Sequence, residues 1–225
     1  MEQKMARGAG LTARQKQLLD LAVGEPYFVN TFYLSGGTAL SYWYLHHRQS
    51  DDLDFFSIIP FDYERIIRWF RYNKQIIQYQ EVRFDEDYGF LKVDLYFASG
   101  MRLLVDFHHY SNTTLESGIV WNGLTIDSLL DITVNKIQAI ATLPRTRDYV
   151  DLYFISKSNL GELTDLLKKI TKKFKEPVDP VQLAKNFLKV SEYTDFPNML
   201  TPFDERDMYM YYENLTRSLK SKIWK

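Results

Sequence analysis

Residues 34–56 read LSGGTALSYWYLHHRQSDDLDFF, and this stretch decides the fold of the chain. The run before it, YFVNTFYL at 27–34, is rich in aromatic and β-branched residues and predicts a buried strand. TALSYWYLHH at 38–47 has helical spacing, and DLDFFSII at 52–59 predicts a second strand. The order is therefore strand, glycine turn, helix, strand.

Patterns around this stretch predict a mixed sheet with helices. Helical spacing marks 11–22 and 61–77. Three strand-like runs lie at 78–84, 89–97 and 101–110, and the turns between them, DEDYG and ASG, have hairpin length. We therefore expect an antiparallel meander.

The rest of the chain is helical in pattern. Asp127 is the expected N-cap of a helix over 128–143, and RTRDYVDLYFISKS begins another at 145. The expected fold class is α+β, with a mixed β-sheet and flanking helices followed by a helical C-terminal subdomain. We expect a catalytic domain over 1–156 and the helical subdomain over 157–225.

Composition excludes several classes of protein. The chain has 225 residues, no cysteine and a net charge of −1, so disulfide frameworks and thiolate zinc sites are excluded. Neither a signal peptide nor an apolar run of membrane-spanning length is predicted, and we expect a cytoplasmic protein. Residues 1–156 carry a net −4 and residues 157–225 a net +3, which suits metal and polyanion binding.

Asp52 and Asp54 alternate along the second predicted strand, so both project from one face while Leu53 and Phe55 point to the core. Neighbouring carboxylates raise each other's pKa unless a cation lies between them. A divalent ion with oxygen ligands resolves this, and magnesium is the expected occupant. The alternative is an acidic strand end exposed to solvent.

Gly36 and Gly37 lie sixteen and fifteen residues before Asp52, between the first strand and Thr38. Glycines let a backbone approach phosphate oxygens closely, and helix N–H groups and the Thr38 hydroxyl are available donors. This predicts a nucleotide phosphate site. A tight strand-to-helix turn without a ligand is the alternative.

Four motifs occur together in a recognisable order: GGTAL, RQSDDLDFF, NKIQAI and RDYVDLY. Their order and spacing resemble the AbiEii/AbiGii toxin family of nucleotidyltransferases, a branch of the DNA polymerase beta superfamily. The resemblance covers about residues 34–152. It implies a nucleotidyltransferase-type fold.

The resemblance also implies two magnesium ions held by three carboxylates, with manganese as the alternative metal. Asp52 and Asp54 supply two of the carboxylates. Asp94 and Asp106 both lie in strand-like runs and could supply the third. Asp106 is preferred, because the family's third aspartate sits on the last strand before the lysine helix. It would accept the proton of the attacking hydroxyl. His108 on the same strand face could assist, and the alternative is an ordinary polar or half-buried histidine.

The lysine helix and the next helix supply the remaining implied residues. The resemblance implies that Lys136 binds the β and γ phosphates. It also implies that Asp151 is needed for activity. Arg48 and Ser50 could contact phosphate, and the alternative is that they only stabilise the loop. The alternative for Lys136 is a surface ion pair with Asp148 or Asp151.

The implied activity is transfer of a nucleoside monophosphate from a nucleoside triphosphate to an acceptor hydroxyl, with release of pyrophosphate. The resemblance implies RNA as acceptor, the 3′ end of tRNA, and a growth-inhibiting toxin with a separately encoded antitoxin. A lysine-rich run at 166–175 could follow a phosphate backbone or be solvated helix surface. Other hypotheses are transfer to protein or to a small molecule such as an aminoglycoside, or an idle nucleotide- or RNA-binding module.

Overall fold

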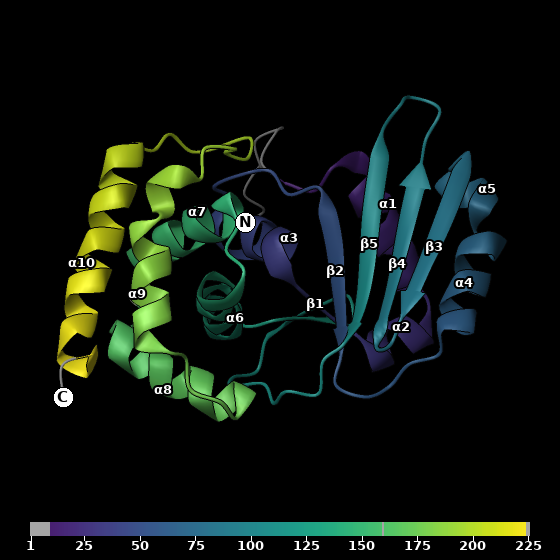
Figure 1. Cartoon of the computed structure of the whole chain (residues 1–225). Coiled ribbons are helices and arrows are strands. Elements are labelled where there is room, and N and C mark those ends of the chain that lie inside the picture. Colours follow the sequence, from purple (N-terminus) through teal and green to yellow (C-terminus); the bar gives the residue numbers. More distant parts are fainter. Residues whose placement is uncertain (1–9, 159, 224–225) are drawn as a thin grey trace, which may run out of the picture. The chain divides into compact units, whose positions relative to one another are not determined.

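A computed structural model describes residues 10–158 and 160–223 (Figure 1). The described chain forms two compact units. The first, the sheet unit, consists of residues 10–42, 50–112 and 118–127. The second, the helical unit, consists of residues 43–49, 113–117, 128–158 and 160–223.

The sheet unit is built on a seven-stranded mixed sheet with the order β3-β4-β5-β2-β1-β7-β6. Its strands are β1 (Tyr33–Ser35), β2 (Asp52–Ser57), β3 (Glu81–Asp87), β4 (Phe90–Tyr96), β5 (Arg102–His109), β6 (Ile119–Trp121) and β7 (Leu124–Ile126). The β2–β5 and β1–β7 pairs are parallel and the others antiparallel. The predicted mixed sheet and its β3–β4–β5 meander are confirmed.

One face of this sheet carries the core of the unit. The helices of the sheet unit are α1 (Ala13–Ala22), α2 (Pro26–Thr31), α3 (Gly36–Leu40), α4 (Tyr63–Tyr72) and α5 (Lys74–Ile77). Figure 1 shows α1, α2, α4 and α5 together on one side of the strands. The ring centroids of Phe28 in α2 and Phe70 in α4 lie 5.8 and 6.3 Å from that of Phe107 in β5. Alternate residues of β2 and β5 therefore face these helices, and the residues between them face away.

The predicted strand over 27–34 is wrong for most of its length, because α2 occupies residues 26–31. Pro26 stands at the first helical position, where its fixed φ suits a helix. The Glu25 side chain caps the helix by accepting the Tyr27 N–H. These local signals outweigh the aromatic and β-branched composition.

Two further segments differ from their predictions. The helix expected over 38–47 is the short α3 followed by a π-helical turn, η1 (Ser41–Leu45). The β6–β7 hairpin was not predicted from the sequence, because each strand has only three residues. The basic amino-terminal segment in which no signal peptide is predicted lies largely outside the described residues.

The helical unit packs five helices around a core of its own. They are α6 (Leu129–Thr142), α7 (Thr146–Ile155), α8 (Leu163–Phe174), α9 (Pro180–Leu188) and α10 (Glu205–Ile223), with short 3₁₀ turns η2 (Ser156–Ser158) and η3 (Val190–Glu192). The Tyr212 hydroxyl donates to the Tyr149 carbonyl at 2.7 Å, and the Tyr149 hydroxyl donates to the Asn186 carbonyl at 2.7 Å. Buried tyrosines thus connect α10, α7 and α9.

The N-cap of α6 is Ser128, so the prediction of Asp127 is wrong by one residue. The Ser128 side chain accepts the Asp131 N–H. Asp127 instead accepts a hydrogen bond from the Ser35 hydroxyl at 2.7 Å within the sheet unit.

The compact units differ in extent from the predicted division at residue 156, because α6 and α7 pack with the C-terminal helices. Whether residues 1–156 and 157–225 are separate domains stays a prediction. Among the described residues, no helix has both the length and the apolar character that crossing a bilayer requires.

The lysine-rich run forms most of α8, and its lysines are not equivalent. Lys168 and Lys172 are exposed, whereas Lys173 is 1% exposed and its ammonium donates to the buried Asp131 at 2.7 Å. Asp131 also accepts from the Ser128 hydroxyl and from the Leu115 N–H. Lys173 therefore links α8 to α6 through a buried ion pair and is not available to bind a phosphate backbone.

We predict that Lys173→Ala lowers the free energy of unfolding by about 3–5 kcal/mol, because it leaves the Asp131 carboxylate buried without its cation. Lys172→Ala, an exposed neighbour on the same helix, is the matched control and should change it by less than about 0.5 kcal/mol. Urea denaturation followed by circular dichroism measures both. Equal effects for the two variants would contradict this role of Lys173.

Candidate active site

The glycine turn lies against the aspartates of β2. Ser35, the last residue of β1, is the register partner of Asp54, and Gly36 follows it with φ +75°. A Cβ atom at Gly36 would lie 2.2 Å from Asp54 Oδ2. Only glycine therefore fits at this position, both for its positive φ and for the close approach of the Asp54 carboxylate.

Thr38 and Ser50 hold the segment that leads into β2. The Thr38 hydroxyl donates to the Asp52 carbonyl, and its side chain is buried. The Ser50 carbonyl accepts from Gln15 Nε2 at 2.8 Å. These contacts fix the start of β2, and phosphate contacts by Thr38, Ser50 and the buried Gly37 stay predictions.

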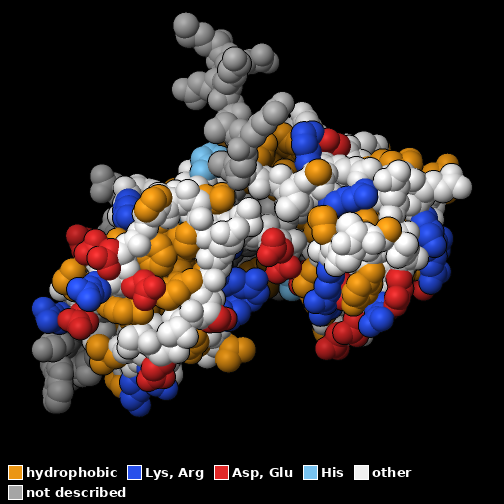
Figure 2. Space-filling model, turned by 90° about the horizontal axis from the view of Figure 1, so that it is seen from above, with side chains coloured by type: hydrophobic (Ala, Val, Ile, Leu, Met, Phe, Trp, Pro, Cys, Tyr) orange, Lys and Arg blue, Asp and Glu red, His pale blue; other side chains and the backbone are white. Residues whose placement is uncertain are grey.

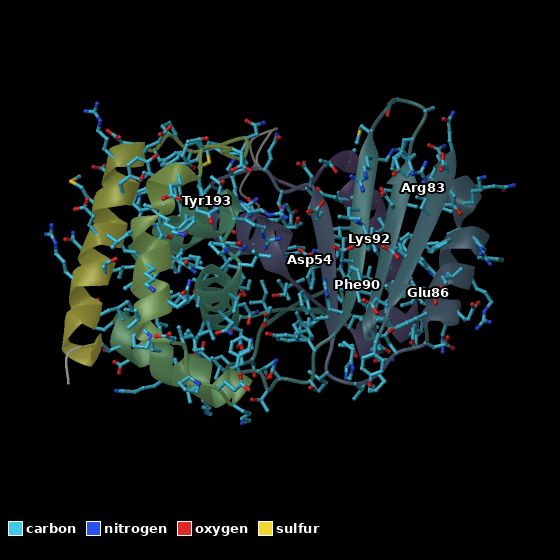
Figure 3. All side chains as sticks on the ribbon, viewed as in Figure 1. Asp54, Arg83, Glu86, Phe90, Lys92 and Tyr193 are labelled. Atoms are coloured by element: carbon cyan, nitrogen blue, oxygen red, sulfur yellow. The ribbon has the colours of Figure 1, made fainter. Side chains whose placement is uncertain are left out.

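The acidic residues lie on the sheet face opposite the phenylalanine core. Asp52 and Asp54 are two residues apart on β2, and Asp54 is the direct register partner of Asp106 on the parallel strand β5. Asp54 and Lys92, both labelled in Figure 3, belong to β2 and β4, the strands on either side of β5. Lys92 is the register partner of Asp106 on its other side.

Asp106 is electrostatically unsatisfied. Its Oδ1 atom is buried and has no hydrogen-bond partner among the described residues. Burial, together with the nearby charges of Asp54 and Asp52, raises the pKa of Asp106 to about 6. A bound cation would stabilise the ionised form of this carboxyl group.

Asp94, the other candidate for the third carboxylate, is already paired. Arg102 donates to it through Nε at 2.6 Å and through a terminal nitrogen at 2.5 Å, and the Tyr96 hydroxyl donates at 2.9 Å. The hydrogen bonds from Arg102 lower the pKa of Asp94. These contacts favour Asp106 as the third carboxylate.

His108 lies two residues beyond Asp106 on the same face of β5. Its ring is stacked on Phe56, with centroids 4.7 Å apart and planes at 16°, and packs against Phe90 at 4.9 Å. Burial lowers the pKa of His108 to about 4, so the imidazole is neutral at neutral pH. Asp54, Asp106 and His108 each offer a ligand atom, and these atoms lie within 4.8 Å of one another.

This set of donors fits a divalent cation. Ligand atoms on opposite sides of an ion bound at about 2.1 Å are separated by about 4.2 Å, which is comparable with the spacing of the three groups. The buried Asp106 oxygen without a partner and its raised pKa point to the same conclusion. The sequence singled out the two aspartates, whereas only the register shows how close His108 comes to them.

The remaining predicted residues form a buried ionic network inside the helical unit. Asp151 is fully buried and accepts from Arg48 Nε at 2.6 Å, from the Lys136 ammonium at 2.7 Å and from His47 Nε2 at 2.8 Å. Lys136 also donates to Asp148 at 2.8 Å. Lys136 is 7% exposed, so its ion pairs with Asp148 and Asp151 are buried and do not lie on the surface as the alternative prediction had it.

The cations of this network keep its carboxylates ionised. Burial acts to raise the pKa of Asp151, but Lys136 and Arg48 outweigh it and hold that pKa well below its ordinary range. Burial likewise lowers the pKa of His47, so this imidazole is neutral. His47 is a participant that sequence reasoning missed, since nothing in HHRQS indicates a partner about a hundred residues away.

The predicted site residues thus fall into two groups. The sheet unit brings together Gly36, Asp52, Asp54 and Asp106, with Gly37, Thr38 and Ser50 in the adjoining turn and loop. The helical unit brings together Arg48, Lys136 and Asp151.

Comparison with known proteins now identifies the chain. The family model described as the nucleotidyl transferase AbiEii toxin of type IV toxin–antitoxin systems matches residues 19–214. The chain belongs to the AbiEii family. It is therefore a nucleotidyltransferase of a type IV toxin–antitoxin family, which implies a nucleoside triphosphate substrate and an antitoxin partner.

A relative and two solved structures resemble this AbiEii family member. The uncharacterized protein aq_aa25 of Aquifex aeolicus strain VF5 is 33% identical over 169 residues, covering 73% of this chain and 76% of that protein. A candidate nucleotidyltransferase from H. pylori has a TM-score of 0.57 at 17% identity, covering 94% of this chain and 97% of that one. JHP933 from Helicobacter pylori has a TM-score of 0.54 at 16% identity, covering 93% and 91%. These structures support the nucleotidyltransferase fold.

We predict that Gly36→Ala lowers the rate of nucleotidyl transfer by about 100-fold, because the added Cβ displaces the Asp54 carboxylate by about 1 Å. Gly100→Ala is the matched control, since Gly100 has a similar φ of +77° but open space around it. Both variants should lose about 1–2 kcal/mol of stability from the positive φ. Transfer assays and thermal melts separate the two effects, and equal transfer rates would refute the clash.

We predict that the raised pKa of Asp106 makes the metal-free protein lose stability as pH rises from about 4 to about 6. The folded chain holds this proton more tightly than the unfolded chain, whose aspartate titrates near 3.8. The contribution of the protonated Asp106 to the free energy of unfolding is therefore complete below about pH 4. It is lost as the pH rises through the pKa of the folded state. Urea unfolding with a chelator should show a smaller decline for Asp106→Asn, and parallel curves would contradict the assignment.

Proposed function

We propose that the protein transfers a nucleoside monophosphate from a nucleoside triphosphate to a hydroxyl at the 3′ end of RNA, with tRNA as the acceptor. Two magnesium ions on Asp52, Asp54 and Asp106 would support the reaction, with manganese as the alternative. The transfer would inhibit growth, and a separately encoded antitoxin would relieve it.

The observation that carries this proposal is the direct pairing of Asp54 with Asp106 across β2 and β5. Two carboxylates in register on one sheet face repel each other, and Asp106 has a buried oxygen with no hydrogen-bond partner in the described part of the chain. Membership of the AbiEii family assigns nucleotidyl transfer to the chain. The paired aspartates are therefore the natural centre of that chemistry.

Bound divalent ions supply a lowered pKa for the acceptor hydroxyl and charge neutralisation for the triphosphate. Asp106 accepts the proton of the acceptor hydroxyl, for which its carboxylate oxygen without a protein donor is suited. The acceptor oxygen then forms a bond to the α-phosphorus. The bond from that phosphorus to the bridging oxygen breaks, and pyrophosphate leaves.

The glycine turn would bind the nucleotide phosphates. Gly36 brings the backbone against the Asp54 carboxylate, so N–H groups of the turn lie beside the proposed metal ligands. Gly37 and Thr38 follow in α3, and their N–H groups extend the same donor surface. The Thr38 hydroxyl holds the Asp52 carbonyl, so its contribution to phosphate binding would come from its backbone.

Lys136 would bind the β and γ phosphates, and Asp151 would position it. A lysine ammonium has three donors. Asp148 and Asp151 accept two of them at 2.8 and 2.7 Å, which fixes the direction of the third. Arg48 donates twice to Asp151, so in this arrangement its effect on phosphate passes through that carboxylate.

The RNA acceptor is supported by the family resemblance and by exposed lysines of α8 such as Lys168 and Lys172. On the face shown in Figure 2, acidic, basic and hydrophobic side chains are interspersed over the helical unit, with no continuous basic surface.

We predict label transfer to RNA when the purified protein is incubated with α-labelled nucleoside triphosphates, magnesium and tRNA. Asp54→Asn should lower the transfer rate by at least about 100-fold, because loss of a metal ligand removes several kcal/mol of transition-state stabilisation. Asp85→Asn, an exposed aspartate on β3, is the control and should keep the wild-type rate.

The same reaction separates the rival acceptors. Label in protein or in an aminoglycoside, with none in RNA for any of the four triphosphates, would sink the RNA proposal. Growth inhibition that persists in Asp54→Asn would favour a binding module without catalysis. Gel separation of RNA from protein, and growth curves of cells expressing each variant, give these readouts.

A further inference from the structure

His108 occupies a position that ring packing alone does not explain. It is the register partner of Phe56 on β2 and of Phe90 on β4, so an aromatic ring stands directly opposite it on both neighbouring strands. Directly opposed side chains on one sheet face are the closest cross-strand neighbours. A third phenylalanine would complete this column equally well, so the imidazole is available for another purpose.

The column fixes the imidazole beside the carboxylates. The planes of His108 and Phe56 are within 16° of each other, and Phe90 packs on the other side at 34°. Packing on both faces fixes the orientation of the ring and therefore the directions in which its nitrogens point. Ligand atoms of His108, Asp54 and Asp106 all lie within 4.8 Å of one another, close enough for one ion to contact all three.

From this geometry we infer that His108 is a metal ligand, and that it makes the site favour Mn²⁺ over Mg²⁺. The inference rests on the proposed metal site at Asp54 and Asp106. Mg²⁺ binds almost exclusively to oxygen, whereas imidazole nitrogen is a good ligand for first-row transition metals, and affinity for nitrogen donors rises along that series. Two carboxylates and one neutral imidazole therefore distinguish the two ions.

His109 provides a matched control. It is the next residue on β5, so its side chain points to the other face of the sheet, where its Cβ lies near Gly89. His108→Phe is the informative variant, because it preserves a ring between Phe56 and Phe90 and removes both nitrogens. His109→Phe makes the same chemical change on the face away from the carboxylates.

Electron paramagnetic resonance of Mn²⁺ bound to the full chain tests the inference without an activity assay. Electron spin echo modulation should show coupling to an imidazole ¹⁴N in wild type and in His109→Phe, and none in His108→Phe. His108→Phe should also weaken Mn²⁺ binding by about tenfold or more, while Mg²⁺ binding, measured by displacement, should change less than about threefold.

The outcomes distinguish this inference from the proposal on which it rests. If Mn²⁺ binds wild type but not Asp54→Asn, the metal site stands. Absence of ¹⁴N coupling in that same wild-type sample would then overturn the role of His108 alone. If Mn²⁺ binding does not depend on Asp54, both the metal site and the role of His108 fail. A Mn²⁺ to Mg²⁺ preference unchanged in His108→Phe would also overturn the inference.

Discussion

The register between β2 and β5 is the constraint on which the sheet site depends. It places Asp54 opposite Asp106, and it places Phe55 opposite Phe107 one residue further along. The two phenylalanine rings stack at 5.1 Å with planes within 9° on the core face. A slip of one residue would move these rings to the opposite face, so burial of the apolar rings fixes the positions of the charged pair. Hydrophobic packing thereby offsets the repulsion between the carboxylates.

The two units place aspartates in opposite electrostatic environments. Asp151 in the helical unit is surrounded by Arg48, Lys136 and His47, and its charge is fully compensated. Asp106 in the sheet unit lies between Asp54 and Lys92, and the net effect of burial and the nearby carboxylates is a raised pKa; one of its oxygens is buried with no hydrogen-bond partner among the described residues. The same side chain thus has a strongly lowered pKa in one environment and a raised pKa in the other. The neighbouring charges, more than the residue type, determine the role.

Much of this arrangement could be predicted because it depends on short-range periodicity. The alternation in DLDFF and LLVDF is enough to place Asp54 and Asp106 on strand faces. The aromatic and β-branched composition of residues 27–31 predicted a strand, but Pro26 and the cap from Glu25 determine a helix there. The partners of Arg48 could not be predicted, because Asp151 lies 103 residues away and no local pattern encodes that pairing. The ion pair of Lys173 could not be predicted either, because its partner Asp131 lies 42 residues away on another helix.

Asp94 and Asp106 occupy similar positions in their strands but differ in their hydrogen-bond partners. Both aspartates stand in strands with apolar neighbours, and the sequence favours Asp106 only through the family's order of elements. In the structure Arg102 occupies both oxygens of Asp94. A metal at Asp94 would have to displace a guanidinium held by two charge-assisted hydrogen bonds, whereas a metal at Asp106 would satisfy an oxygen that has no partner. Competition between protein cations and metal therefore favours Asp106 over Asp94 as the proposed third carboxylate.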